Sequence, residues 1–561
     1  MKLYVKGGGE VVLSQADFVA QGGEGRIYAQ GDTAYKVYLD PARTLPLAKI
    51  GELRAIADPN VIRPERVLLD HKGVPLGYTM RYVAGTFVLA QLLTRSFRER
   101  HGIGPEAMAA LVLRAREGLE AIHRAGALVV DLSEMNLLVG RRFDAVYFID
   151  VDSFATPHFP ATALTPGVRD PDASTFSPGS DWFSFAVVSF QMFTGIHPYK
   201  GRHPTVKGLE ERMRLRLTVL DPSVGVPAGC YPLDVVPEAW RGWYRAVLER
   251  GERLPPPSDV AAPVVVRASA PLGRAERLTL TTLATFDAAV LGVWEDGDTR
   301  VVSTDGGVFV GARRAHDGRV RAVGFSPRLG RPVAFDEAGG LHDLTSGALI
   351  PLGIQVDDVM STGGRLIVRC RDALYELVLS ELGRAGALLA ATRKVASVLP
   401  RATRLFDGVA VQDLLGAKYV SVFPRTGSCH QLRIPELEGV ELVDARYDRG
   451  VLMARVARGS RYDRLVVRFD DTGTGYDVRC DEDVGLADLD FVVLDSGVCV
   501  HRLEEGRLEL FPARPGRTER RTLMDPLLDG DVSLLRIGGG LGLRRGRTVY
   551  QMGMTERVSG A

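Results

Sequence analysis

The chain has 561 residues, of which 45% are hydrophobic and 25% charged, and 70 basic residues nearly balance 69 acidic ones. This length predicts more than one domain, and the balanced charge argues against nucleic acid as an obligatory partner. Five cysteines without a C-x-x-C pair argue against a disulfide framework or a zinc site and favour the cytoplasm. The N-terminus lacks the apolar segment of a secretory signal. The longest apolar run, residues 182–193, is too short to cross a bilayer, so we expect no membrane span.

A glycine-rich hairpin in residues 20–40 is the first candidate nucleotide-binding element. Gly22, Gly23 and Gly25 precede an alternating strand, and Lys36 lies on the next strand. Glycines let backbone N–H groups approach phosphate oxygens because no Cβ stands in the way, and a nearby lysine can pair with the same phosphates. A plain glycine-rich hairpin is the alternative. The P-loop pattern G-x-x-x-x-G-K-[ST] is absent, which argues against a P-loop NTPase.

Apolar residues at helical spacing predict a helix over residues 41–57, which carries Glu52. Glu52 is expected within reach of Lys36 as an ion pair, with a solvated helix glutamate as the alternative. Two strands are expected in residues 63–83, and a further helix over residues 108–125.

The central stretch, VVDLSEMNLLVGRRFDAVYFIDVDSF at residues 129–154, holds two groups of oxygen ligands. Asp131 and Asn136 follow one apolar run, and Asp150 and Asp152 follow another, with a hairpin between them. Carboxylate and carboxamide groups at the ends of buried strands can hold Mg²⁺ and aim a hydroxyl at a phosphate. Asp152 has a second interpretation, as a cap of the following turn.

Three helices are expected after this stretch, over residues 182–194, 206–216 and 238–250. Residues 254–275 are rich in proline, alanine and serine, which is typical of a semi-rigid linker between domains.

The order of these motifs resembles that of eukaryotic-like protein kinases over roughly residues 10–258. It is most similar to the divergent bacterial branch associated with tellurite-resistance and stress operons, where D-L-x-x-x-N and I-D-x-D-S-F runs occur. The resemblance implies a bilobal α+β kinase domain at residues 1–253. Its N-lobe would cover about 1–83 and its C-lobe about 84–253.

The resemblance also implies a role for each matching residue. Asp131 would be the catalytic aspartate, Asn136 and Asp150 the Mg²⁺ ligands, and Asp181 the buried helix aspartate that supports the catalytic loop. Lys36 would pair with the α- and β-phosphates of ATP and be oriented by Glu52. The remaining ATP-binding positions would be Gly22, Gly23, Gly25, the gatekeeper Met80, and the hinge residues Arg81, Tyr82 and Val83.

The sequence departs from the kinase pattern at several positions. Val129 and Val130 replace the His-Arg pair before the catalytic aspartate, so a phosphorylated activation loop would lack its arginine partner. Ser133 replaces a lysine near the γ-phosphate, and Asp152 stands where D-F-G has glycine. All five core positions of the kinase pattern remain, which favours an active enzyme over a pseudokinase. They are Lys36, Glu52, Asp131, Asn136 and Asp150.

Residues 276–561 read as all-β, with short strands between Gly- and Asp-containing turns. Seven loose units of about 40 residues indicate a seven-bladed β-propeller, with the strand at residues 277–286 closing the ring. Six or eight blades, an irregular β-sandwich or two stacked β-domains are the alternatives. His316, His342, His430 and His501 are isolated in the sequence, so we expect surface positions for them and no metal constellation.

The predicted function is transfer of the γ-phosphate of ATP to a serine or threonine of a protein substrate, with Mg²⁺ as cofactor. The propeller would present a substrate or protein partner, or regulate the kinase, an inference that rests on fold analogy. A catalytically weak nucleotide-binding scaffold that acts through the propeller is one alternative. AMP transfer or small-molecule phosphorylation on the same fold is the other.

Overall fold

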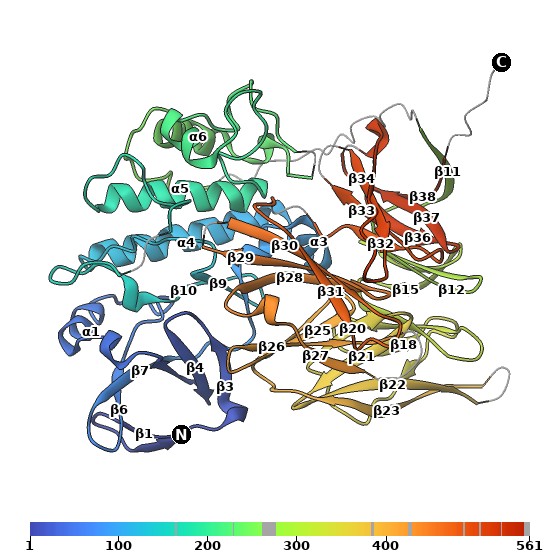
Figure 1. Ribbon diagram of the computed structural model, residues 1–561, viewed down its shortest axis with the longest axis horizontal. Helices are drawn as coiled ribbons and strands as arrows, with labels where there is room; N and C mark the ends of the chain where they lie inside the picture. Colours follow the sequence, from blue (N-terminus) through green and yellow to red (C-terminus); the bar gives the residue numbers. More distant parts are fainter. Residues whose placement is uncertain are drawn as a thin grey trace.

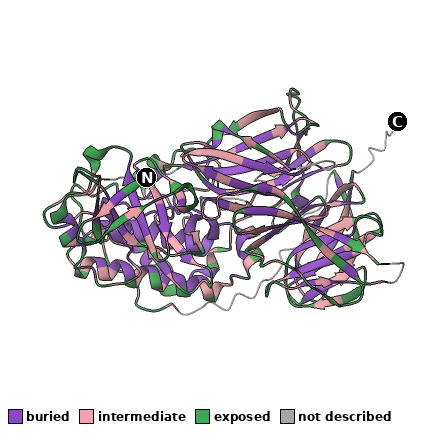
Figure 2. Cartoon of the chain, turned by 90° about the horizontal axis from the view of Figure 1, so that it is seen from below, coloured by how far each residue is buried: buried purple, intermediate pink, exposed green. Residues whose placement is uncertain are grey.

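The computed structural model describes residues 1–162, 165–227, 229–260, 277–382, 386–424, 429–459, 461–485, 488–503, 506–528 and 530–554. A helix-rich N-terminal part lies beside a C-terminal part built from strands (Figure 1). Most of the predicted linker, residues 254–275, lies outside the described residues. Buried residues fill the interior of both parts, and exposed residues concentrate on loops and outer strands (Figure 2).

The N-terminal part begins with an antiparallel sheet in the order β2-β1-β6-β7-β5-β4-β3. Its strands are β1 (Lys2–Val5), β2 (Glu10–Val12), β3 (Phe18–Gln21), β4 (Gly25–Gln30), β5 (Thr33–Tyr38), β6 (Arg66–Leu69) and β7 (Pro75–Arg81). β5 lies between β4 and β7 and is buried along almost its whole length. It therefore offers a rigid position for any side chain that points from it into the protein.

Helix α1 (Leu47–Leu53) is shorter than the helix predicted over residues 41–57. Residues Pro41–Arg43 form a separate 3₁₀ turn, and Pro46 is the N-cap of α1. Proline lacks the N–H of a helix interior, so the helix starts only after Pro46.

The rest of the N-terminal part packs helices around a small sheet in the order β10-β9-β8. The strands are β8 (Thr86–Val88), β9 (Leu137–Gly140) and β10 (Val146–Phe148), and the helices are α2 (Leu89–Leu92), α3 (Arg95–His101), α4 (Pro105–Arg124), α5 (Pro178–Thr194), α6 (Leu209–Leu215) and α7 (Glu238–Tyr244), which continues as a π-helical turn to Glu249. From Ser180 onward every residue of α5 is buried. A helix that is buried all round forms the centre of its domain, and α4 packs beside it (Figure 1).

Within the described ranges, the C-terminal part forms seven four-stranded antiparallel sheets. The first six are β12 (Val290–Asp296), β13 (Thr299–Thr304), β14 (Gly307–Val310), β15 (Arg313–Asp317); β16 (Val320–Phe325), β17 (Pro332–Asp336), β18 (Leu341–Asp343), β19 (Leu349–Ile350); β20 (Asp358–Thr362), β21 (Arg365–Cys370), β22 (Ala373–Glu381), β23 (Leu388–Ser397); β24 (Thr403–Phe406), β25 (Val409–Leu414), β26 (Ala417–Val422), β27 (His430–Arg433); β28 (Glu441–Asp448), β29 (Val451–Arg458), β30 (Arg461–Phe469), β31 (Tyr476–Asp481); and β32 (Phe491–Val493), β33 (Val498–Leu503), β34 (Arg507–Pro512), β35 (Arg521–Met524). The seventh is β36 (Ser533–Ile537), β37 (Gly540–Arg545), β38 (Thr548–Met554) and β11 (Leu278–Thr285). The first strand of the C-terminal part thus completes the last sheet, beside β38.

Each sheet shares a hydrophobic cluster with the next sheet along the chain. A seventh cluster joins the last sheet to the first and includes Phe286, Val290, Val302, Ile537 and Val549. Within the described residues, sheet-to-sheet packing therefore closes on itself, with the last sheet packed against the first.

The N-terminal and C-terminal parts are held together by apolar and polar contacts. Ala90 of α2 belongs to one hydrophobic cluster with Val443, Ala457 and Tyr462 of the C-terminal part. Glu99 of α3 forms an ion pair with Arg544 at 2.9 Å. Among the described residues, no helix has the length and apolar character needed to cross a membrane.

Candidate functional site

Lys36 lies on β5 and is only 5% exposed. Its Nζ donates to Asp150 Oδ1 at 2.8 Å and to Asp152 Oδ2 at 2.7 Å. β7 passes very close at this point, since a Cβ on Gly77 would lie 1.9 Å from the Lys36 carbonyl oxygen. Only glycine permits this approach. Gly77 therefore allows β7 to pack closely against β5, the strand that carries Lys36.

The charges around Lys36 are tightly coupled. Burial alone would lower the pKa of Lys36, but the carboxylates of Asp152 and Asp150 outweigh it and raise that pKa. Burial and the neighbouring Asp152 raise the pKa of Asp150 despite Lys36. Burial acts the same way on Asp152, yet the Lys36 ammonium and the Tyr38 hydroxyl lower its pKa. Asp152 is thus the ionised partner that keeps the buried lysine charged.

Asp152 is held from several sides. The Tyr38 hydroxyl donates to Asp152 Oδ2 at 2.6 Å, and Lys49 Nζ of α1 donates to the Asp152 backbone oxygen at 2.7 Å. The interpretation of Asp152 as a turn cap therefore misses its main contacts. A second acid two residues after Asp150 was the available sequence signal, but only the fold brings it to Lys36.

The expected ion pair between Glu52 and Lys36 is not formed among the described contacts. Glu52 Oε1 instead accepts from His158 Nδ1 at 2.7 Å, at an exposed site. Lys49, one turn earlier on α1, is buried and donates to the Asp152 backbone oxygen. Asp152 and Asp150 take the place expected for Glu52 in this conformation.

Asp181 of α5 is fully buried and supports the segment before Asp131. Its Oδ2 accepts the backbone N–H of Val129 and its Oδ1 that of Val130, both at 2.9 Å. His123 Nε2 donates to the same carboxylate at 2.9 Å. Val130 has φ of 64°, a left-handed conformation that is strained for a β-branched residue. The bonds to Asp181 hold this strained turn in place.

Asp131 and Asn136 face each other across the loop between them. Asn136 Nδ2 donates to the Asp131 backbone oxygen at 3.1 Å and to Asp131 Oδ2 at 3.3 Å. Asp131 Oδ1 is buried and has no hydrogen-bond partner among the described residues. Buried polar atoms are normally satisfied, so this oxygen is available to a group that enters the site.

The pairing of β9 with β10 brings Asn136 next to Asp150. Leu137 pairs with Phe148, and the Ile149 N–H donates to the Asn136 carbonyl at 3.0 Å. Asn136 thus ends one strand of the hairpin where Asp150 follows the other. Asp150 has φ of 57° and a side chain that is 40% exposed, in contrast to the buried Asp152. Asp150 can therefore present an oxygen outward while Lys36 holds the other.

The glycine-rich turn joins β3 to β4. The Gly22 N–H donates to the Gly25 carbonyl at 3.0 Å. A Cβ on Gly25 would lie 2.9 Å from the Val37 carbonyl oxygen, so glycine is needed there for packing. Gly22 and Gly23 have open space around their Cα atoms instead, which leaves room for a ligand beside the turn.

The expected hinge begins at the end of β7. Met80 pairs with Ala34 of β5, and the Arg81 guanidinium donates to the Pro59 carbonyl at 2.6 Å. The Tyr82 N–H donates to the Asp32 carbonyl at 2.8 Å, so it cannot also bind an adenine in this conformation. Val83, the last predicted hinge residue, follows directly.

The donor set fits Mg²⁺ and a nucleotide. The outward carboxylate of Asp150 and the amide oxygen of Asn136 are hard oxygen ligands of the kind Mg²⁺ takes. Lys36 and the open turn at Gly22 and Gly23 offer positive charge and space for phosphates. The unpartnered Asp131 Oδ1 adds an acceptor for a hydroxyl.

The histidines of the C-terminal part correct the expectation of isolated surface positions. His501 is 1% exposed and contacts Glu509. His316 and His342 are half-buried and lie together with Asp336. Strand pairing and sheet packing create this proximity, which sequence spacing does not reveal.

No protein-family model matches the chain. The chain is similar to the serine/threonine-protein kinase PkaB of Streptomyces coelicolor, with 27% identity over 205 residues that span 33% of this chain and 45% of PkaB. It therefore spans less than half the length of this curated relative. A solved structure, the Cydia pomonella granulovirus kinase PK-1, is similar over 42% of this chain and 86% of its own, with 14% identity and a TM-score of 0.33. The sequence similarity supports a kinase-like N-terminal region.

Proposed function

We propose that the protein is a serine/threonine protein kinase that uses Mg²⁺ and ATP. The observation that carries this proposal is the buried, unpartnered Asp131 Oδ1 beside Asn136, with Asp150 and Lys36 linked to the same loop and hairpin. The similarity to a Streptomyces serine/threonine kinase supports it.

The residues would divide the reaction as follows. Bound Mg²⁺–ATP would supply the phosphoryl group, and the positive charge of the metal would offset the negative charge of that group. Asn136 and Asp150 would hold the metal, and Lys36 would bind phosphate oxygens after exchanging at least one carboxylate partner. Asp131 Oδ1 would accept the proton of the serine or threonine hydroxyl, while Asp181 keeps the loop in position.

The proposed domains are a kinase domain at residues 1–253, with lobes at about 1–83 and 84–253, a linker at 254–275 and a β-propeller at 276–561. The closed series of seven sheets and shared clusters supports seven blades, because a propeller joins its last sheet to its first. All five cysteines lie in the described residues and none of them forms a disulfide, which fits a cytoplasmic location. The D-L-x-x-x-N and I-D-x-D-S-F runs support placement in the tellurite-resistance and stress-operon branch.

The β-domain is proposed to regulate the kinase or to present its protein substrate or partner. The buried Tyr462 hydroxyl donates to Glu134, a residue between Asp131 and Asn136. Met135, the next residue, packs against the same hydrophobic cluster as Tyr462. A partner that shifts the β-domain would therefore act directly on the loop that carries Asp131.

The test uses ATP labelled at the α- or the γ-phosphate, Mg²⁺, the full chain and generic protein acceptors. Transfer from the γ-label alone, lost in Asp131→Ala and Asp150→Ala, is the expected result. Asp144→Ala is the matched control, because Asp144 lies on the same hairpin but is exposed. Transfer from the α-label would instead establish AMP transfer, and equal transfer by Asp131→Ala would refute the assignment.

A nucleotide-binding scaffold is the second candidate function. It is favoured by the contacts of Lys36, which is held by Asp150 and Asp152 while Glu52 points elsewhere. ATP that stabilises the chain without any transfer, to itself or to acceptors, would support this alternative.

A further inference from the structure

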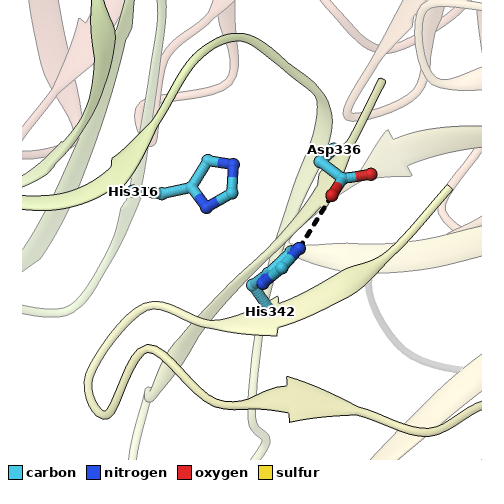
Figure 3. Close-up of side chains that lie close together, drawn as sticks. All are labelled: His316, Asp336 and His342. Carbon is cyan, nitrogen blue, oxygen red and sulfur yellow. Dashed lines mark hydrogen bonds and ion pairs between the residues drawn. The ribbon is translucent and has the colours of Figure 1, made fainter. Parts of the chain in front are cut away.

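Two histidines and one aspartate meet between two neighbouring sheets of the C-terminal part. His316 lies on β15, the last strand of its sheet, whereas Asp336 and His342 lie on β17 and β18 of the next sheet. Figure 3 shows the His316 ring pointing across the gap toward the other two side chains. The three residues come from separate strands, so sheet packing rather than local sequence assembles them.

The donor atoms are close enough to share one ion. One ligand atom from each residue lies within 4.8 Å of the others. The rings of His316 and His342 have centroids 4.6 Å apart, and His342 Nε2 lies 2.8 Å from Asp336 Oδ2. Donors bound about 2.1 Å from a tetrahedral ion are roughly 3.4 Å apart. A small movement of His342 Nε2 and Asp336 Oδ2 away from each other would bring this pair to that spacing, and His316 already lies within 4.8 Å of both.

The surrounding backbone prepares the carboxylate. The Gly340 N–H donates to Asp336 Oδ1 at 2.7 Å, which directs Oδ2 toward His342. A Cβ on Gly340 would lie 3.0 Å from both Asp336 Oδ2 and His342 Nε2. Glycine at this position keeps the space beside both donors clear.

We propose that His316, Asp336 and His342 bind a divalent transition-metal ion of the Zn²⁺ type, with water as a further ligand. Two imidazoles and one carboxylate favour such an ion over Mg²⁺ or Ca²⁺, which prefer oxygen ligands. The ion would tie the last strand of one sheet to the middle strands of the next. This site is independent of the proposed kinase activity.

The full chain, stripped of metal with a chelator, is titrated with Zn²⁺ against a chromophoric competitor in millimolar Mg²⁺, and Co²⁺ serves as the spectroscopic probe. We expect one tight equivalent and the intense visible absorption of a tetrahedral Co²⁺ site. His316→Ala and His342→Ala should each weaken binding at least tenfold. Asp336→Asn should weaken it similarly while preserving the shape of the site.

His430→Ala is the matched control, because His430 also lies on the last strand of a sheet and is also half-buried. It should bind Zn²⁺ like the wild type. The proposal is overturned if the wild type shows no saturable binding, or if all three site variants, shown to be folded by circular dichroism, bind as tightly as the wild type. Binding that is lost in Asp150→Ala but kept in His316→Ala would place the ion at the candidate active site and also overturn it.

Discussion

Replacing Asp152 by asparagine should destabilise the N-terminal part while leaving its shape intact. Asp152 is 4% exposed, and its Oδ2 accepts from both Lys36 and Tyr38. A hydrogen bond to a charged group contributes about 1.5–3 kcal/mol. An asparagine oxygen can still accept both bonds but carries no charge, and Asp150 still pairs with Lys36, so the expected loss in the free energy of unfolding is about 2–3 kcal/mol.

The pH dependence gives a second signature. The pKa of Asp152 is lowered in the folded state, so its ionised form contributes stability above the unfolded pKa of about 4. This stability is lost as pH falls through the depressed folded pKa. The difference in the free energy of unfolding between wild type and Asp152→Asn should therefore be largest at pH 7 and decrease progressively below about pH 4.

Urea unfolding followed by tryptophan fluorescence is the assay. Trp182, Trp240 and Trp243 lie in the N-terminal part and Trp294 in the C-terminal part, so the signal mainly reports the region of interest. Asp144→Asn, at an exposed site, is the control and should change stability by less than about 0.5 kcal/mol. An Asp152→Asn chain that unfolds with the wild-type midpoint would refute the role given to Asp152.

Three further predictions concern buried contacts. Asp181→Ala leaves the N–H groups of Val129 and Val130 without their acceptor, so it should lower the free energy of unfolding in urea by about 2–5 kcal/mol and abolish phosphate transfer. Unchanged stability would contradict the proposed support of this loop by Asp181. Tyr462→Phe removes only the hydroxyl that donates to Glu134, so thermal unfolding should show a decrease of about 1–3 kcal/mol in the free energy of unfolding. The control Tyr419→Phe, on the half-exposed β26, should leave this free energy almost unchanged. Burial lowers the pKa of His501 to about 4, so stability should fall by up to about 1.4 kcal/mol per pH unit from pH 6.5 to pH 4, and His501→Gln should flatten this slope; parallel pH profiles would contradict it.

Local pattern predicted those parts of the fold that depend on neighbouring residues. The apolar run beginning at Trp182 became α5, because a segment that is apolar all round must be buried. The strand expected at residues 277–286 does complete the last sheet, as β11 beside β38. Helical spacing predicts a helix from residue 41, but α1 begins only at Leu47, after Pro46.

Contacts between distant segments escaped the sequence. Which carboxylate meets Lys36 depends on the placement of α1 and on the turn after β10, and these bring Asp152 to Lys36 while Glu52 contacts His158. The cluster of His316, Asp336 and His342 depends on the packing of two sheets. The contact of Tyr462 with Glu134 depends on how the two parts dock. None of these distances is encoded in spacing along the chain.

The most direct test of the account compares wild type and Asp131→Asn for both ATP binding and γ-phosphate transfer. The asparagine has the size of the aspartate but cannot accept the proton of a hydroxyl as a base. ATP with Mg²⁺ should stabilise both chains equally against heat, while transfer by Asp131→Asn should fall by about 10²–10⁴-fold. Equal transfer by the two chains, with equal ATP binding, would contradict the assignment of Asp131 and the proposed kinase mechanism.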